Sequence, residues 1–207
     1  NTPAKLFYEL HKLDMPVLVI PHHPLHFMGW EHDPEFQRLF EIYSMWGLSE
    51  TVNDDCAFSH PVKYHHGGFS YQDALARGYR LGVTGGGDNH DSLPGIRYGT
   101  DPWRKGKMAQ RPGLVAVYAK ENTREAIFDA LWNRRCYATT GNRMLIDFRI
   151  NGALMGSELK GINERKIEIT VIGERKLAYV AVIKNGEEVY KQLVDTGEAH
   201  LTWVDPS

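Results

Sequence analysis

Residues 85–95 read Gly-Gly-Gly-Asp-Asn-His-Asp-Ser-Leu-Pro-Gly and directly follow a short apolar run over 81–83. The pattern predicts a strand over 80–84 that ends in a sharp glycine turn. Along an extended backbone, side chains two residues apart point the same way, so Asp88 and His90 are expected to lie side by side. A carboxylate and an imidazole offered to a common point suit a divalent metal ion. Taken alone, the stretch also fits an ordinary turn whose Asp and His satisfy local backbone groups.

A second segment favours the metal-site interpretation. Residues 16–26 read Pro-Val-Leu-Val-Ile-Pro-His-His-Pro-Leu-His, in which 17–20 has the continuous apolar pattern of a buried parallel strand. His22 and His23 follow the proline that ends this run. In parallel α/β folds, sites lie on the loops beyond the carboxyl ends of the strands. Two strands that both end in metal-competent residues predict a shared metal site, with one of the two adjacent histidines pointing away from it.

Composition bounds the classes of protein to consider. The 207 residues are 42% hydrophobic and 24% charged, with a net charge of −2, so no overall basic field indicates a nucleic-acid partner. The two cysteines, Cys56 and Cys136, form neither a disulfide framework nor a CxxC pair, and Cys136 is expected to be a small buried residue. No apolar stretch approaches the ~20 residues that cross a bilayer. Oligomeric state and cell compartment stay open.

The first part of the chain alternates helical and strand-like patterns, which predicts a mostly parallel α/β unit over 1–143. Asn122 and Glu125 form a capping-box signature for the last helix. We expect helices over 2–13, 34–40, 70–76 and from 122, and strands over 17–20, 40–45, 80–84 and 114–118. The unit has too few strands to close a barrel and opens on a helix, so further barrel elements are expected upstream of this chain.

The pattern changes after residue 143, and a small antiparallel, sandwich-like β domain is predicted over 144–207. Asn151-Gly152 and Asn185-Gly186 are strong turn signals, and the second lies between two runs that predict a hairpin. The expected strands cover 145–150, 166–172, 177–184, 188–194 and 199–204.

Four segments of the chain resemble the PHP superfamily of metal-dependent phosphoesterases, named for polymerase and histidinol phosphatase. The similarity is closest to a branch of large PHP-like proteins described as a domain of unknown function. It spans roughly residues 15–150 and corresponds to the C-terminal part of the family's domain. The segments are Ile-Pro-His-His-Pro (20–24), Glu-Ile-Tyr-Ser-Met-Trp-Gly (41–47), Gly-Gly-Asp-Asn-His-Asp-Ser-Leu-Pro-Gly (86–95) and Thr-Arg-Glu-Ala-Ile-Phe-Asp-Ala-Leu-Trp-Asn-Arg-Arg-Cys-Tyr-Ala-Thr-Thr-Gly-Asn-Arg (123–143).

The resemblance implies a distorted β/α (TIM-like) barrel, of which 1–143 would be a part, with two or three divalent metals at the strand ends. Its third motif falls on His23 or His22, and its fourth, Asp-x-His, on Asp88 and His90. The family's first motif and the His and Glu of its second motif are absent from this chain. The principal further ligands are therefore expected outside it. Mixed nitrogen and oxygen ligands suit Zn, Mn or Fe.

A metal site of this kind predicts a metal-dependent hydrolase of phosphoesterase type, with Asp88 and His90 in catalytic roles and a small-molecule phosphoester as substrate. Two alternatives stay open: a non-enzymatic binding module on a PHP-derived scaffold, and an amidohydrolase-like C–N hydrolase. Glu41 begins a strand and could face the site, the core or solvent. Substrate-binding candidates are Arg143, Arg97 and His65.

Overall fold

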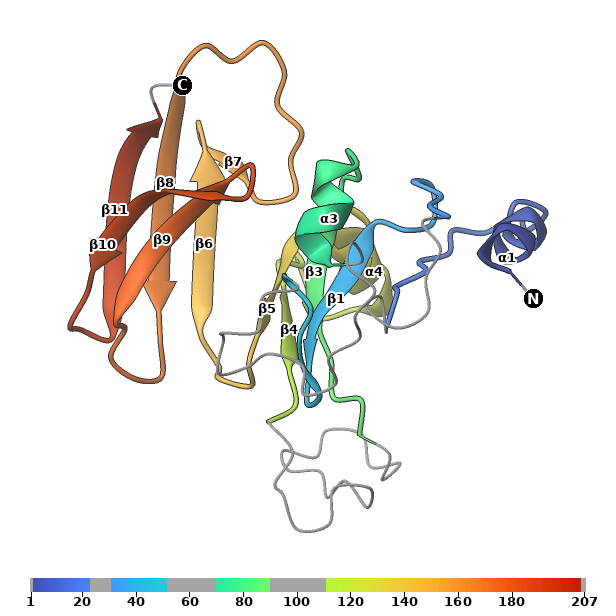
Figure 1. The fold of residues 1–207 in the computed structure, drawn as a ribbon, viewed down its shortest axis with the longest axis horizontal. Helices are drawn as coiled ribbons and strands as arrows, with labels where there is room; N and C mark the ends of the chain where they lie inside the picture. Colours follow the sequence, from blue (N-terminus) through green and yellow to red (C-terminus); the bar gives the residue numbers. More distant parts are fainter. Residues whose placement is uncertain (1, 23–30, 52–69, 90–110, 206–207) are drawn as a thin grey trace.

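The structure is a computed structural model that describes residues 2–22, 31–51, 70–89 and 111–205 (Figure 1). Its helices are α1 Pro3–Leu10, α3 Tyr71–Ala76 and α4 Arg124–Trp132. The strands that precede residue 140 are β1 Leu39–Ser44, β2 Gly47–Leu48, β3 Gly82–Gly85, β4 Leu114–Val117 and β5 Cys136–Thr139. Those that follow are β6 Leu145–Ile150, β7 Ala153–Leu154, β8 Arg165–Ile172, β9 Tyr179–Lys184, β10 Glu187–Leu193 and β11 Glu198–Asp205.

Each helix begins at a polar cap. The Thr2 side chain accepts from the third residue of α1, and Ser70 and Asp73 form a reciprocal capping box at α3. The predicted helix over 70–76 is thus confirmed, and α1 lies within the predicted 2–13. The expected cap at Asn122 was wrong by one residue, because the Thr123 hydroxyl accepts from the Ala126 amide instead.

The predicted partial β/α barrel of PHP type is not formed. Among the described strands only β1 and β3 pair in parallel, whereas β2 on β1, β4 on β5 and all pairs within β6–β11 are antiparallel. The described strands form small separate sheets, in the orders β2-β1-β3, β4-β5, β11-β8-β6-β7 and β10-β9, and none of them closes on itself.

Two elements of the expected barrel are absent from the described chain. Residues 17–20 are extended but belong to no strand ladder, and Val19 N donates to Phe36 O at 3.0 Å, three residues before β1 begins. Ile20 is exposed rather than buried, so the apolar run was misread as a buried strand. The helix expected over 34–40 is a single turn at 34–36, after which β1 begins.

The strand β5 was not predicted, and it decides how β4 pairs. The two run antiparallel, with Val115 opposite Ala138. β4 itself was expected to be buried, but Leu114 and Val115 are each 40% exposed. β5 is held close to β3, where the buried Cys136 thiol lies 3.4 Å from the Val83 carbonyl oxygen. The expected burial of Cys136 is confirmed.

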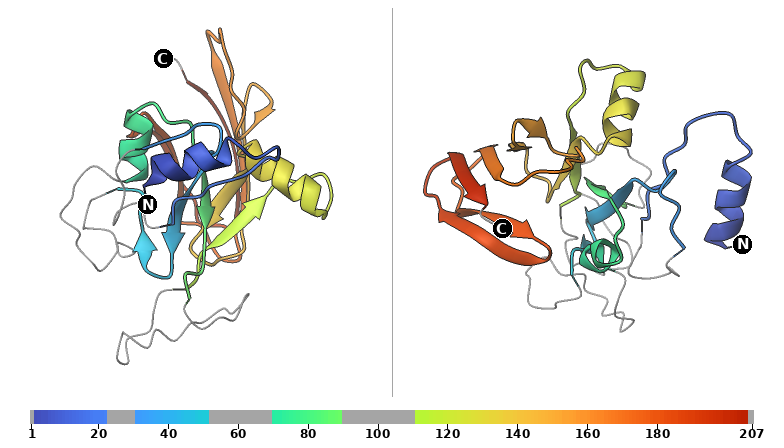
Figure 2. Two further views of the ribbon diagram at one scale, coloured as in Figure 1. Left: turned by 90° about the vertical axis from the view of Figure 1, so that its right-hand side faces the viewer. Right: turned by 90° about the horizontal axis from the view of Figure 1, so that it is seen from above.

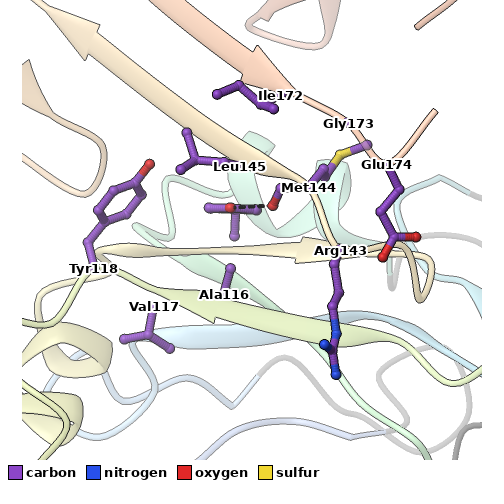
Figure 3. A pocket seen from close by; sticks show the side chains of 10 residues that line it. Ala116, Val117, Tyr118, Arg143, Met144, Leu145, Ile172, Gly173 and Glu174 are labelled. Carbon is purple, nitrogen blue, oxygen red and sulfur yellow. Dashed lines mark hydrogen bonds between the residues drawn. The ribbon is translucent and has the colours of Figure 1, made fainter. Parts of the chain in front are cut away.

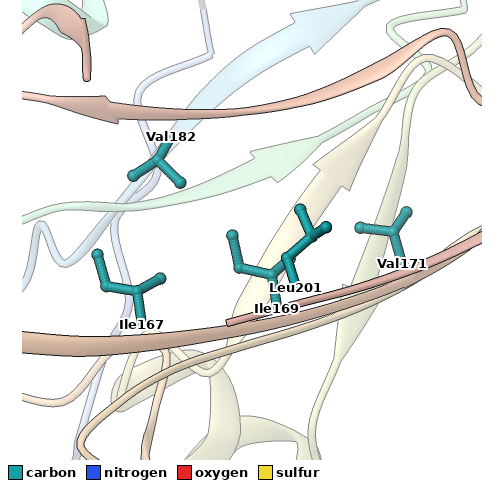
Figure 4. Packing of buried hydrophobic residues seen from close by; sticks show 5 residues of the cluster. All are labelled: Ile167, Ile169, Val171, Val182 and Leu201. Carbon is teal, nitrogen blue, oxygen red and sulfur yellow. The ribbon is translucent and has the colours of Figure 1, made fainter. Parts of the chain in front are cut away.

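The strands expected after residue 143 are all present. The Asn185-Gly186 hairpin is confirmed, and both residues have positive φ, as a tight two-residue turn requires. The β9–β10 hairpin covers one face of the four-stranded sheet. Figure 4 shows Val182 of β9 pointing toward the buried side chains of β8 and β11, which are Ile167, Ile169, Val171 and Leu201.

The parts before and after residue 143 are joined by tyrosine hydroxyls. Tyr118 donates to the Ile146 carbonyl at 2.6 Å, and Tyr137 donates to the Met144 carbonyl at 2.7 Å. The helix α1 lies at the far end of the molecule from the sheet that holds β8 and β11 (Figures 1 and 2). In the part of the chain that the structure describes, no helix is long and apolar enough to cross a membrane.

Candidate metal site

His22, Glu41 and Asp88 form a cluster in which the imidazole lies between two carboxylates. Nδ1 of His22 is 2.9 Å from Oε1 of Glu41, and Nε2 is 3.1 Å from Oδ1 of Asp88. The His22 side chain is 43% exposed, whereas those of Glu41 and Asp88 are 15% and 6% exposed. The cluster therefore opens to solvent through the imidazole, and its carboxylates are nearly enclosed.

The β1–β3 pair brings these residues together from distant parts of the chain. Glu41 lies in β1 opposite Thr84 of β3, and Asp88 follows three residues after β3 ends. The backbone amide of Glu41 donates to the Pro21 carbonyl at 3.3 Å, which places His22 beside β1. The prediction that His22 and Asp88 approach one another is borne out by this geometry, although only one of the two strands expected to deliver them is formed.

Two glycines of the run, Gly85 and Gly86, are closely packed. A Cβ at Gly85 would lie 2.7 Å from the Leu114 carbonyl oxygen, and a Cβ at Gly86 would lie 2.7 Å from Oε2 of Glu41. At Gly85 the neighbour is backbone, so a larger residue does not fit, whereas at Gly86 a Cβ would force the Glu41 carboxylate to move. Gly86 thereby lets the Glu41 carboxylate lie directly against the backbone of the turn.

Asp88 adopts a left-handed backbone with φ of 48°, so the extended geometry assumed through this residue was wrong. The side-by-side projection expected from alternation therefore does not apply, and His90 lies outside the described residues. The turn is instead held by Trp46, whose indole Nε1–H donates to the Asp88 carbonyl at 3.1 Å. The amide of Met45 donates to the Gly87 carbonyl at 3.3 Å.

The two carboxylates strongly favour a cation at His22. Hydrogen bonds that the imidazole donates to Asp88 and then to Glu41 raise the pKa of His22 from 6.5 to about 10, against the opposing effect of desolvation. Even with a protonated imidazole, these three side chains carry more formal negative than positive charge. The cluster is therefore an electrostatic environment that suits a proton or a metal cation.

The separation of the donor atoms fits a pair of ligands on one ion. Two donors bound at ~2.1 Å lie about 3.0 Å apart in octahedral and about 3.4 Å apart in tetrahedral coordination, and Nε2 of His22 and Oδ1 of Asp88 are 3.1 Å apart. Metal-bound histidines usually donate their other N–H to a carboxylate, which is the place of Glu41. These residues fit part of a site, since within 2–22, 31–51, 70–89 and 111–205 no group of three acidic, His or Cys side chains is arranged to hold an ion.

The other predicted site residues are not in this cluster. Arg143 lines an open groove of about 480 Å³ between the β4–β5 pair and the ends of β6 and β8, together with Leu145 and Glu174 (Figure 3). Four further candidates lie outside the described residues, namely His23, His65, His90 and Arg97.

Sequence reasoning left Glu41 open and missed Trp46 altogether. A carboxylate inside an apolar strand signals a buried polar role, because such a group needs a partner. A tryptophan just after the strand signals an indole N–H that needs an acceptor. Neither signal identifies the partner, since both contacts join residues far apart in sequence.

Comparisons with known proteins find one matching family description and several similar proteins. Residues 96–160 match the family described as a protein of unknown function, DUF3604. The chain is 34% identical over 185 residues to an uncharacterised protein of Chlamydia pneumoniae, covering 83% of this chain and 28% of that protein. It is 33% identical over 165 residues to one of Chlamydia trachomatis, covering 73% of this chain and 25% of that protein. The chain thus spans about a quarter of the length of these relatives, and no solved structure matches it.

Proposed function

We propose that this chain contributes one edge of the metal site of a metal-dependent hydrolase that acts on phosphoesters. The observation that carries the proposal is the approach of His22 Nε2 to Asp88 Oδ1 at 3.1 Å, with the opposite imidazole nitrogen bonded to Glu41. The resemblance to the PHP superfamily supports it, because Asp88 falls on that family's Asp-x-His motif. The proposed ions are Zn, Mn or Fe, with two or three in the complete site.

A bound divalent cation would supply Lewis acidity and would neutralise charge on a phosphoester. His22 would bind it through Nε2, and Asp88 would bind it through a carboxylate that Trp46 and the glycine turn hold in place. The cluster is open to solvent on the side of the half-exposed His22 ring, and a substrate would bind on that side. Further ligands would come from His23 and His90 or from other parts of a longer polypeptide.

The test is a hydrolysis assay of bis-p-nitrophenyl phosphate and p-nitrophenyl phosphate with added Mn²⁺ or Zn²⁺. It uses the longest natural polypeptide that contains this chain. We expect metal-dependent turnover that Asp88→Ala abolishes and Asp33→Ala preserves, since Asp33 binds His11 at a different place. Full activity of Asp88→Ala would contradict the proposal.

The same assay separates the two alternative activities. Turnover of amide substrates without turnover of phosphoesters would indicate a C–N hydrolase, because similar metal sites support both reactions. Metal binding without turnover of any substrate class would instead favour a binding module on the same scaffold.

A further inference from the structure

Glu41 is bonded to the 21–22 segment through both its backbone and its side chain. Its amide donates to the carbonyl of Pro21, and its carboxylate accepts from the ring of His22, which directly follows Pro21 in the chain. A residue that binds neighbouring groups in this way fixes the position of the loop and the rotation of the ring together.

The carboxylate of Glu41 is itself closely confined. Its side chain is 15% exposed, and Oε2 lies only 2.7 Å from the position that a Cβ at Gly86 would take, so the carboxylate packs directly against the backbone of the glycine turn. Glu41 also lies in β1, where it pairs with Thr84 of the parallel strand β3. Its position is thus set by the same turn that leads to Asp88.

The contact is made at the imidazole nitrogen that faces away from Asp88. A neutral imidazole has one N–H, and the hydrogen bond at one nitrogen decides which nitrogen is left as a ligand. An N–H held at Nδ1 by a carboxylate leaves the lone pair at Nε2 and makes that nitrogen more basic. In this cluster Nε2 is the nitrogen 3.1 Å from Asp88.

We propose that Glu41 is a positioning residue that holds His22 in the tautomer and orientation needed for Nε2 to share a divalent cation with Asp88. This role rests on the proposed metal site and adds to it a residue that is not itself a ligand. Loss of such a carboxylate typically weakens metal binding by about 10–100-fold.

The test is a titration with Zn²⁺ by isothermal titration calorimetry of the longest natural polypeptide that contains this chain, prepared metal-free, in wild type and five variants. We expect about 10–100-fold weaker binding for Glu41→Ala. Glu41→Gln should retain more affinity, because its amide oxygen still accepts from Nδ1–H. Gly86→Ala should weaken binding by displacing the Glu41 carboxylate.

Asp33→Ala is the matched control. Asp33 bonds the ring of His11 at 2.8 Å, much as Glu41 bonds that of His22. The second carboxylate beside His11 is that of Glu35, which lies farther away at 3.6 Å and is 62% exposed, unlike the nearly buried Asp88. Removal of the Asp33 carboxylate should leave the affinity for Zn²⁺ unchanged. Equal losses for Asp33→Ala and Glu41→Ala would overturn the proposed role.

A spectroscopic measurement separates positioning from a merely structural effect. In the Zn²⁺-bound wild type, the Nδ1 proton of His22 should be visible by NMR as a slowly exchanging, hydrogen-bonded resonance. Glu41→Ala should lose it and Glu41→Gln should keep it. If this resonance and the affinity for Zn²⁺ both survive in Glu41→Ala while Asp88→Asn weakens binding, the role of Glu41 is wrong and the metal site stands. No binding by wild type would contradict the metal site and this role together.

Discussion

Two nearly buried aspartates have opposite electrostatic settings in the two parts of the molecule. Asp205, at the end of β11, is 3% exposed and lies 2.7 Å from Lys184 of β9 and 3.6 Å from Arg165 of β8. Asp88, beyond β3, has a side chain that is 6% exposed and bonds the imidazole of His22, which also bonds Glu41. In these contacts between described residues, Asp205 faces permanent cations, whereas Asp88 faces a titratable imidazole that also bonds a second carboxylate.

The difference separates a structural carboxylate from a functional one. Asp205 joins β8, β9 and β11, so its ion pairs tie the β9–β10 hairpin to the four-stranded sheet. At Asp88 the partner can lose its proton, and a metal ion can take the place of that proton. The comparison predicts that changes at Asp205 alter stability alone, whereas changes at Asp88 alter metal binding.

The largest effect is expected from Asp88→Asn. Replacement of the carboxylate removes a charged ligand, and we expect Zn²⁺ affinity to fall by at least about 100-fold, or about 2.7 kcal/mol. The measurement is calorimetric titration, with urea unfolding as the control for folding. If Asp88→Asn lowers the free energy of unfolding by more than it weakens the free energy of Zn²⁺ binding, the distinction between the two aspartates is lost.

Asp205→Asn is the reciprocal change. Hydrogen bonds to charged groups contribute about 1.5–3 kcal/mol, and the partners at 28% and 35% exposure recover part of their hydration. We therefore expect the free energy of urea unfolding to fall by about 2 kcal/mol, with Zn²⁺ affinity unchanged. Weaker metal binding in this variant would show that the two parts are energetically coupled.

A smaller effect is expected from Ile169→Val, in the core beneath the hairpin. Ile169 is buried among the side chains of β8, β9 and β11, and deletion of one methylene there costs about 1 kcal/mol. Urea unfolding measures the loss, and the affinity for Zn²⁺ provides the control. A change in that affinity would contradict the assignment of this core to the β6–β11 sheets alone.

The smallest effect is a dependence of stability on pH in the metal-free chain. The pKa of His22 is raised to about 10 in the folded state, so its stabilisation is complete below about pH 6.5 and is lost as the pH rises through 10. Because the ring is partly exposed, this contribution is below about 1 kcal/mol.

The test compares wild type and His22→Gln in urea from pH 7 to 10. The difference in unfolding free energy should shrink as the pH approaches 10. A difference for His22→Gln that grows with pH would contradict the assigned direction of the shift.

Five of the strands after residue 143, namely β6, β8, β9, β10 and β11, were predictable from the sequence because their information is local, whereas the two-residue strand β7 was not predicted. Alternating side chains define which face is buried, and Asn-Gly at 151–152 and 185–186 fixes two turns. The barrel expected before residue 143 was wrong because it depended on pairings between distant segments. The apolar run over 17–20 looks like a buried strand, yet nothing in its own sequence decides whether a neighbour completes a ladder.

The candidate site was predictable in part for the same reason. Motifs at the ends of two apolar runs pointed to His22 and Asp88, and these two side chains do meet. The sequence left open whether Glu41 faces the site, the core or solvent, and it did not reveal the role of Trp46. Both roles depend on the β1–β3 register and on the left-handed turn at Asp88. Neither the register nor that turn is encoded by residue type alone.

The most direct measurement of the central claim is a Zn²⁺ titration of the longest natural polypeptide that contains this chain, followed by the ¹⁵N NMR shifts of its histidine rings. The account predicts that His22 changes from a protonated imidazole to one bound to metal at Nε2 with a proton at Nδ1. His11, which lies between Asp33 and Glu35, should not respond. A His22 ring that stays protonated at saturating Zn²⁺, or a His11 ring that responds equally, would contradict a metal site at Asp88.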